Sequence, residues 1–235
     1  MLFPARCAVC GGLGASPCPP CRRALLPAAP GPVPPGLDRL VALYAYRAGV
    51  RPLIGALKYR NNRALLPWAS AVLADAWEEH HLGGALTWAP TSAARARRRG
   101  FDQSAVLARA LRRELRGRSG NLPDLLPLLR RVPGPAQTGR HAADRRAVHF
   151  EVRRRPPLSV VIFDDVLTTG ATLAAAAEAL RGAGAVRVAA LVLARTPAPP
   201  ATTNAAVTPR PVPRFRDPEP AEFVRLALLC PRGGP

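Results

Sequence analysis

The chain has 235 residues, and its 34 lysines and arginines against 15 acidic residues give a formal net charge of +19. This length suits one α/β domain with a small additional module, and the charge favours anionic partners. Among the basic residues only Lys58 is a lysine. The first seven residues lack a basic region followed by an apolar run, and no stretch is long enough to span a membrane. A secretory signal and a membrane span are therefore not expected, and the cytoplasm is the expected location.

Two C-x-x-C pairs lie near the amino terminus, and they comprise Cys7 with Cys10 and Cys18 with Cys21. Four thiolates suit tetrahedral zinc, and the glycine-rich spacer of seven residues between the pairs can fold back. Disulfides and free thiols are the alternatives, although a cytosolic protein disfavours structural disulfides. Four protein ligands leave no open position on the metal, so the expected role of Zn²⁺ is structural.

Beyond a proline-rich linker at residues 28–35, apolar periodicity predicts alternating strands and helices. The expected strands lie at residues 40–46, 86–89, 125–132, 160–163 and 186–194, and the expected helices at 53–58, 63–79, 104–116 and 173–183. Strand–helix–strand units of this kind imply a parallel sheet with right-handed crossovers. The expected fold class is therefore α/β, a parallel sheet flanked by helices, with a small amino-terminal zinc-binding module.

The most informative stretch is residues 159–172, in which an apolar run leads directly to two acids and then to small polar residues. The acids are Asp164 and Asp165, and the residues after them are Thr168, Thr169, Gly170, Ala171 and Thr172. Unpaired amides at the start of the following helix, with threonine hydroxyls, suit a phosphate. The two carboxylates suit neighbouring ribose hydroxyls, so the pattern predicts a sugar 5-phosphate site. The alternative is a plain strand–turn–helix unit in which a threonine caps the helix.

A second predicted strand–loop–helix unit carries a basic segment between the strand at 86–89 and the helix at 104–116. Its arginines include Arg97, Arg98 and Arg99, and Gly100 follows them. Guanidinium groups and loop amides suit a pyrophosphate, so the expected role of this loop is to bind one. The alternative is a loop that faces solvent or nucleic acid.

Residues 161–172 resemble the phosphoribosyl-pyrophosphate (PRPP) motif of type I phosphoribosyltransferases. The cysteine pairs, residues 54–59 (similar to I-x-x-L-K-Y) and residues 97–103 (similar to R-x-R-G-F-N-Q) narrow the resemblance to the ComF family, and it extends from residue 7 to about 195. Asp102 stands where that family has Asn. Because an ionised Asp accepts hydrogen bonds but cannot donate them, we expect a structural role for Asp102 and no direct contact with an anion.

The resemblance implies that the chain binds PRPP with Mg²⁺ and transfers the phosphoribosyl group to a nucleobase-type acceptor. Asp164 and Asp165 would then hold the ribose hydroxyls, residues 168–172 the 5′-phosphate, and residues 97–100 the pyrophosphate. A loop near residues 135–146 would close over the site. The ComF family is also associated with DNA uptake. The alternative is therefore a non-catalytic competence protein that binds single-stranded DNA and a helicase-like partner.

The expected organisation has three parts. Residues 1–35 form the four-cysteine zinc-binding module and linker, residues 36–196 the phosphoribosyltransferase-like domain, and residues 197–235 a Pro/Arg-rich tail without fixed structure. The fifth cysteine, Cys230, has no partner in this pattern.

Overall fold

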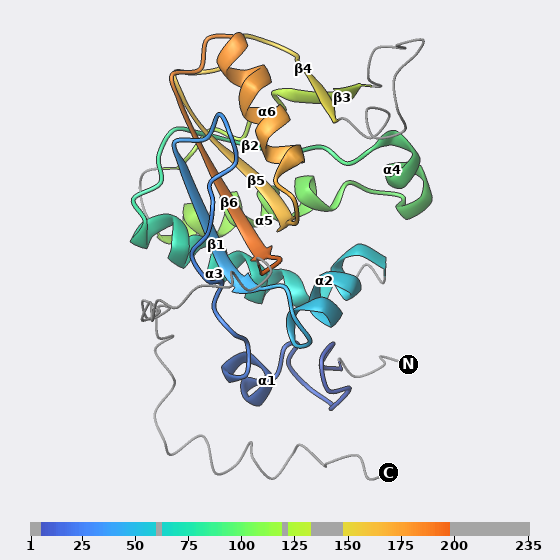
Figure 1. Cartoon of the computed structure of the whole chain (residues 1–235). Coiled ribbons are helices and arrows are strands. Elements are labelled where there is room, and N and C mark those ends of the chain that lie inside the picture. Colours follow the sequence, from blue (N-terminus) through green and yellow to red (C-terminus); the bar gives the residue numbers. More distant parts are fainter. Residues whose placement is uncertain (1–5, 60–62, 119–121, 133–147, 198–235) are drawn as a thin grey trace, which may run out of the picture.

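The computed structural model describes residues 6–59, 63–118, 122–132 and 148–197 (Figure 1). Its strands are β1 (Arg39–Ala45), β2 (Ala85–Trp88), β3 (Leu129–Val132), β4 (His149–Val152), β5 (Ser159–Leu167) and β6 (Arg187–Arg195). Its helices are α1 (Pro19–Arg23), α2 (Val50–Tyr59), α3 (Leu66–Glu79), α4 (Ala93–Arg99), α5 (Gln103–Arg118) and α6 (Ala171–Gly182), with a 3-10 turn, η1, at Arg63–Leu65. The loop predicted near residues 135–146 and the tail from residue 198 lie outside the described residues.

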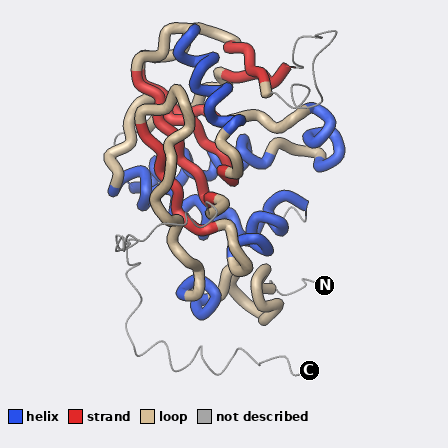
Figure 2. Tube along the Cα trace, viewed as in Figure 1, coloured by secondary structure: helices blue, strands red, loops and turns tan. Residues whose placement is uncertain are grey.

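The central feature is a parallel sheet with the strand order β1-β6-β5-β2, and an antiparallel pair, β3 and β4, stands beside it (Figure 2). Helix α6 packs on one face of the sheet, and α3 and α5 pack on the other (Figure 1). Because helices cover both faces, the middle strands are apolar on both sides, as parallel strands usually are. The predicted fold class, an α/β parallel sheet flanked by helices, is confirmed.

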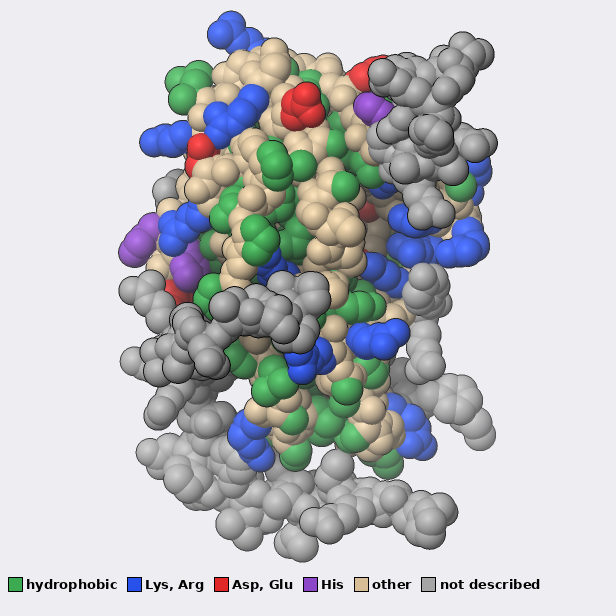
Figure 3. All heavy atoms as spheres, in the orientation of Figure 1, with side chains coloured by type: hydrophobic (Ala, Val, Ile, Leu, Met, Phe, Trp, Pro, Cys, Tyr) green, Lys and Arg blue, Asp and Glu red, His purple; other side chains and the backbone are tan. Residues whose placement is uncertain are grey.

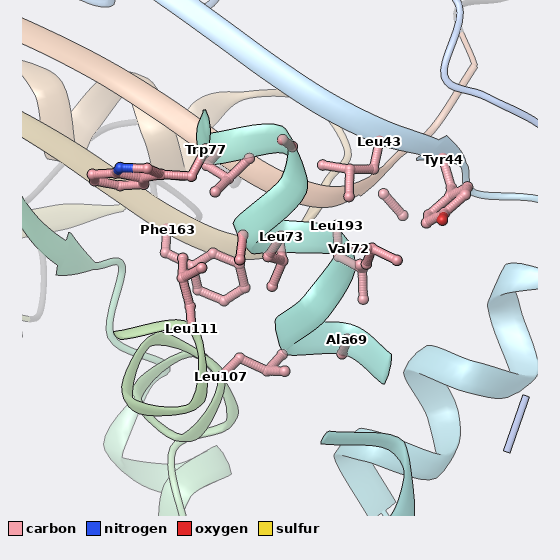
Figure 4. Packing of buried hydrophobic residues seen from close by; sticks show 14 of the residues in the cluster. Leu43, Tyr44, Ala69, Val72, Leu73, Trp77, Leu107, Leu111, Phe163 and Leu193 are labelled. Carbon is pink, nitrogen blue, oxygen red and sulfur yellow. The ribbon is translucent and has the colours of Figure 1, made fainter. Parts of the chain in front are cut away.

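The larger of the two apolar clusters includes residues of β5, α3 and α5. Phe163 of β5 is fully buried and lies against Leu73 of α3 and Leu111 of α5 (Figure 4). Its neighbour Ile162 is also fully buried, but in the second apolar cluster, on the α6 side. This alternation is the two-residue period of a strand buried on both faces. It fixes the orientation of β5 immediately before the two acids.

Short segments of the chain extend both edges of the parallel sheet. Segment 26–28 forms backbone hydrogen bonds to Leu43 and Ala45 of β1, at 3.0 and 2.9 Å. At the other edge, segment 124–126 bonds to the N–H and the carbonyl of Leu86 in β2, at 2.8 and 2.9 Å. The first segment also ties the cysteine-bearing amino terminus to the sheet.

The basic segment differs from its prediction, because residues 93–99 form helix α4 and not a loop. Ser92 caps the helix by accepting a hydrogen bond from the Arg95 N–H at 3.4 Å, and Gly100 ends it in the left-handed conformation at φ 78°. Alanine and arginine are good helix formers, and a serine cap with a terminal glycine is the usual boundary of a short helix.

Strand β5 is longer than predicted and runs through both acids to Leu167. Asp164 and Val166 still pair in parallel register with Val192 and Ala194 of β6. The carboxylates therefore belong to the end of a rigid strand, and the turn before α6 is only three residues long. None of the helices in the described ranges is long and apolar enough to cross a membrane.

Candidate functional site

A cavity of about 310 Å³ opens at the carboxyl end of β5 and of its neighbour β2. Its walls come from the ends of these strands, from α2, α4 and α5, from β3 and from the start of α6. Open parallel sheets bind ligands at this edge, where the loops after the strands diverge. The sheet thus gathers side chains that are far apart in the sequence.

Asp164 and Asp165 line the floor of this cavity and have different partners. One oxygen of Asp164, Oδ1, accepts hydrogen bonds from the Asp165 N–H at 2.9 Å and from the Ser104 hydroxyl at 3.2 Å. The Asp165 Oδ2 atom lies 2.9 Å from Nζ of Lys58, and both side chains are mostly buried. The two carboxylates are therefore held by groups from α5 and α2 as well as from their own strand.

The environment of Asp164 opposes its negative charge. Burial, followed by the charge of Asp165, raises the pKa of Asp164 to about 7, although the Asp165 N–H, Lys58 and Ser104 act in the opposite direction. Without a ligand, Asp164 thus gains or loses its proton near neutral pH. Hydroxyl groups that donate to the ionised carboxylate would favour the charged form. A diol ligand and this carboxylate therefore stabilise each other.

The turn after β5 places only part of the predicted phosphate segment in the cavity. Thr168 and Thr172 line it, whereas Thr169, Gly170 and Ala171 are not among its lining residues. The Thr169 hydroxyl accepts a hydrogen bond from the Ala171 N–H at 3.4 Å, which tightens the start of α6. Gly170 caps that helix at φ 84°, and a Cβ there would lie 3.0 Å from Cγ of Pro34. Glycine is therefore required by the backbone and by its neighbour.

Arginines form the opposite wall of the cavity. Arg95 and Arg99 of α4 and Arg131 of β3 line it, whereas Arg97, Arg98 and Gly100 do not. Burial, followed by the nearby charge of Arg95, lowers the pKa of Arg131, while Asp164 opposes this shift. An anion bound between these guanidinium groups would relieve their repulsion. Figure 3 shows basic side chains gathered at the right of this face, in the region of α4.

Asp102 has the structural role that its sequence position predicts. Its Oδ1 accepts from the N–H groups of Ser104 and Ala105 at 3.1 and 3.4 Å, which caps α5. Its Oδ2 accepts from the Thr91 N–H at 3.1 Å, which ties the loop after β2 to the same helix. The carboxylate thus holds together two walls of the cavity.

Gln103 lines the same cavity and is only 3% exposed. Its side-chain oxygen has no hydrogen-bond partner among the described residues. Because a buried polar atom without a partner is costly, this amide is available for a ligand.

Several cavity residues were not assigned to the site by the sequence prediction: Lys58, Gln103, Ser104, Arg95 and Arg131. Two of them carry a signal in the sequence. Lys58 is the chain's one lysine, and Gln103 ends the stretch that is similar to R-x-R-G-F-N-Q. Arg131 carries no such signal, because β3 reaches the site only through the tertiary fold.

A family model described as "Phosphoribosyl transferase domain" matches residues 155–208. Its match covers β5, the turn after it, α6 and β6, which is the segment that carries both acids and the threonines. Among solved structures, a purine phosphoribosyltransferase from Pyrococcus horikoshii Ot3 is similar, with 15% identity, a TM-score of 0.32, and coverage of 71% of this chain and 99% of its own. No curated protein matches.

The family match covers less than a quarter of the chain, and it shows that residues 155–208 are similar to a phosphoribosyl transferase domain. It agrees with the part of the sequence that resembles the PRPP motif. The narrower resemblance to the ComF family stays a prediction.

The four amino-terminal cysteines Cys7, Cys10, Cys18 and Cys21 form a compact cluster, with all sulfur atoms within 4.8 Å of one another. Cys10 Sγ and Cys18 Sγ lie 3.7 Å apart. Tetrahedral zinc with Zn–S bonds of ~2.3 Å places its sulfur ligands ~3.8 Å apart, so this spacing fits the metal. The cluster can hold a structural metal ion such as zinc, as the paired spacing predicts.

Ionisation of the cluster is uneven without a metal. Burial opposes the charge of Cys7, but the backbone N–H groups of Cys10, Cys18 and Val9 outweigh it and lower the pKa of Cys7 to about 6. Burial, followed by neighbouring thiols, raises the pKa of Cys21. One thiolate is thus favoured, and a bound cation is needed before all four ionise.

A second cavity of about 600 Å³ adjoins the first and shares Pro90 and Asp102 with it. Trp88 and Phe101 line this second cavity together with Arg109 and Arg153. The Arg109 guanidinium lies 5.7 Å from the centroid of the Trp88 ring. Aromatic and cationic side chains therefore stand together in a cavity that adjoins the first one at Pro90 and Asp102.

Proposed function

We propose that this chain binds PRPP with Mg²⁺ in the first cavity and transfers the phosphoribosyl group to a nucleobase-type acceptor. The observation that carries this proposal is that one cavity at the end of β5 brings together the acid pair Asp164 and Asp165, two threonines of the segment after β5, and three arginines. The family match over residues 155–208 supports the general kind of activity.

Each wall of the cavity has a proposed role. Asp164 and Asp165 accept hydrogen bonds from the ribose hydroxyls, and residues 168–172 hold the 5′-phosphate with hydroxyls and the first amides of α6. On the pyrophosphate side, we assign Arg99 from the predicted set and add Arg95 and Arg131, because these three arginines line the cavity. The other predicted residues, Arg97, Arg98 and Gly100, lie outside its lining and contribute only through the position and charge of α4. Gln103, with its unpartnered amide oxygen, adds a polar contact to the ligand.

The reaction breaks the bond between ribose C1 and the pyrophosphate oxygen and forms a bond from C1 to a nitrogen of the acceptor. Positive charge develops on the ribose ring, and the nearby carboxylates stabilise it. Negative charge develops on the pyrophosphate, and the arginines stabilise it. Bound Mg²⁺ supplies further neutralisation of the pyrophosphate. The chain therefore acts mainly by positioning and by charge.

Calorimetric titration with PRPP and Mg²⁺ tests the binding step. Asp165→Asn keeps the shape of the side chain but loses a charge-assisted hydrogen bond, so we expect roughly tenfold weaker binding or more, from ~1.5–3 kcal/mol. The control is Asp124→Asn, which removes the same charge at an exposed position. Equal affinity of the wild type and Asp165→Asn would place the ligand elsewhere, and no binding by the wild type would reject the proposal. Pyrophosphate release with a panel of nucleobases then tests transfer.

The second cavity favours a second candidate function, the binding of single-stranded DNA. Trp88 and Phe101 offer aromatic faces on which bases stack, and Arg109 and Arg153 offer contacts to phosphates. We expect this binding to be independent of base sequence. We also expect the logarithm of the binding constant to fall by ~0.7 per phosphate contacted for each tenfold rise in salt concentration. DNA binding that Phe101→Ala weakens, in a protein without pyrophosphate release, would favour this candidate over transfer.

A further inference from the structure

Helix α2 brings its last turn to the acidic floor of the cavity. Leu53, Ile54 and Leu57 are almost completely buried in the core, so the position of this helix does not depend on Lys58. Lys58 instead lines the cavity, with its Nζ 2.9 Å from Asp165 Oδ2. The side chains of this pair are 21% and 10% exposed, so water weakens the attraction only in part.

We propose that Lys58 is a positioning residue of the ribose site, which holds Asp165 in place and, through its charge, readies the Asp164–Asp165 pair to accept two neighbouring hydroxyls. This inference rests on the proposed function. The ammonium binds Oδ2 of Asp165 and leaves the other oxygen, Oδ1, to a ligand. A second carboxylate beside it, Asp164, faces the same space.

Composition supports this role. Of the 34 lysines and arginines in the chain, only residue 58 is a lysine. An ammonium is a compact charge on a flexible stem and fits beside a single carboxylate oxygen. A guanidinium is planar and broad, and it binds both oxygens of a carboxylate at once. An arginine at this position would therefore compete with the ligand for Oδ1.

The charge of Lys58 also acts on Asp164, which other charged groups surround. The groups that face it are Asp165 on its own strand, Lys58 on α2, Ser104 on α5 and Arg131 on β3, with Arg95 and Arg99 of α4 in the same cavity. Lys58 lowers the pKa of Asp164 against the burial and the like charge that raise it. Without the ammonium, Asp164 keeps its proton to a higher pH, and a protonated carboxyl group accepts a hydrogen bond from a hydroxyl more weakly than a carboxylate does.

The test measures binding of ribose 5-phosphate and of 2-deoxyribose 5-phosphate between about pH 5.5 and about 9. This range extends to both sides of the raised pKa of Asp164. The variants are Lys58→Met, which removes the charge, and Lys58→Arg, which keeps it. The control is Arg113→Met, which removes a positive charge from an exposed position of α5. The phosphate of the ligand titrates alike in every variant, so differences between variants report on the protein.

Three results are expected. The wild type binds ribose 5-phosphate more tightly as the pH rises through the titration of Asp164, and it discriminates against the 2-deoxy ligand. Lys58→Met binds ribose 5-phosphate roughly tenfold more weakly at neutral pH, the size of one charge-assisted hydrogen bond, and its affinity rises only at higher pH. The Lys58→Met variant also discriminates less strongly against the 2-deoxy ligand. In Lys58→Arg, which keeps the positive charge, the dependence of binding on pH stays as in the wild type.

Other results overturn the inference in distinguishable ways. If the wild type binds but Lys58→Met shows the same affinity and pH profile, Lys58 has no positioning role and the proposed function stands. If Arg113→Met or Lys58→Arg shifts the pH dependence of ribose 5-phosphate binding as far as Lys58→Met does, a specific effect of the Lys58 charge is refuted. If the wild type binds neither sugar phosphate nor PRPP, the proposed function fails and this inference fails with it.

Discussion

Asp102 offers the sharpest test of how the cavity is held together. Its carboxylate accepts three backbone hydrogen bonds, two that cap α5 and one that holds Thr91 in the loop after β2. Loss of the cap costs ~0.5–2 kcal/mol, and loss of a hydrogen bond to a charged group costs ~1.5–3 kcal/mol. Because Asp102 is half-buried, water replaces part of the loss. We therefore expect Asp102→Ala to lower the free energy of unfolding by roughly 2–4 kcal/mol.

The substitution Asp102→Asn separates the two contributions. Asparagine caps helices as well as aspartate does, but its amide nitrogen cannot accept from the Thr91 N–H. We expect a loss of ~1–2 kcal/mol for Asp102→Asn, which is smaller than for the alanine variant. Urea unfolding measures the loss of stability in both Asp102 variants. Their thermal midpoints should fall by ~2–4 °C for each kcal/mol lost in a chain of this size. The control is Asp124→Ala, which removes a charge from an exposed position. If Asp102→Ala is no less stable than this control, the bonds do not support the cavity as argued.

Two further predictions concern the cysteine cluster and the turn after β5. Protein purified without added metal should contain one Zn²⁺ per chain by elemental analysis, and Cys10→Ser should lower that content, because four thiolates fit the metal. Reduced protein that neither contains nor takes up zinc would refute the assignment. Gly170→Ala should destabilise the chain by ~1–3 kcal/mol in urea unfolding, because the residue is left-handed and its Cβ would crowd Pro34. Gly182→Ala, which lies in open space near the end of α6, should not destabilise it, and equal effects of the two substitutions would reject this account.

The sequence predicts those parts of the fold and site that depend on local pattern. The apolar run before Asp164 and the helix formers after Gly170 predict β5 and α6, because a buried parallel strand and a capped helix each have a local signature. The paired cysteines likewise predict their cluster, since two knuckles of this spacing converge on one metal.

The rest of the site depends on contacts between distant segments. Helix α2 follows β1, which is separated from β5 by β6 in the sheet, so no local pattern shows that Lys58 reaches Asp165. Arg131 enters the cavity only because β3 pairs with β4 beside α6. The predicted loop at residues 93–99 is wrong for a different reason, because alanine and arginine both favour a helix, whereas the high charge of the segment is equally compatible with an exposed loop.

The two segments that extend the sheet have a consequence for how this protein associates with others. A sheet edge normally presents a row of unpaired N–H and carbonyl groups, to which a strand of another molecule can add. Here segment 26–28 occupies part of that row on β1, and segment 124–126 occupies part of it on β2. Addition of a foreign strand at these positions would first have to displace the chain's own backbone. The fold thereby resists edge-to-edge aggregation along the strands that carry its cavity.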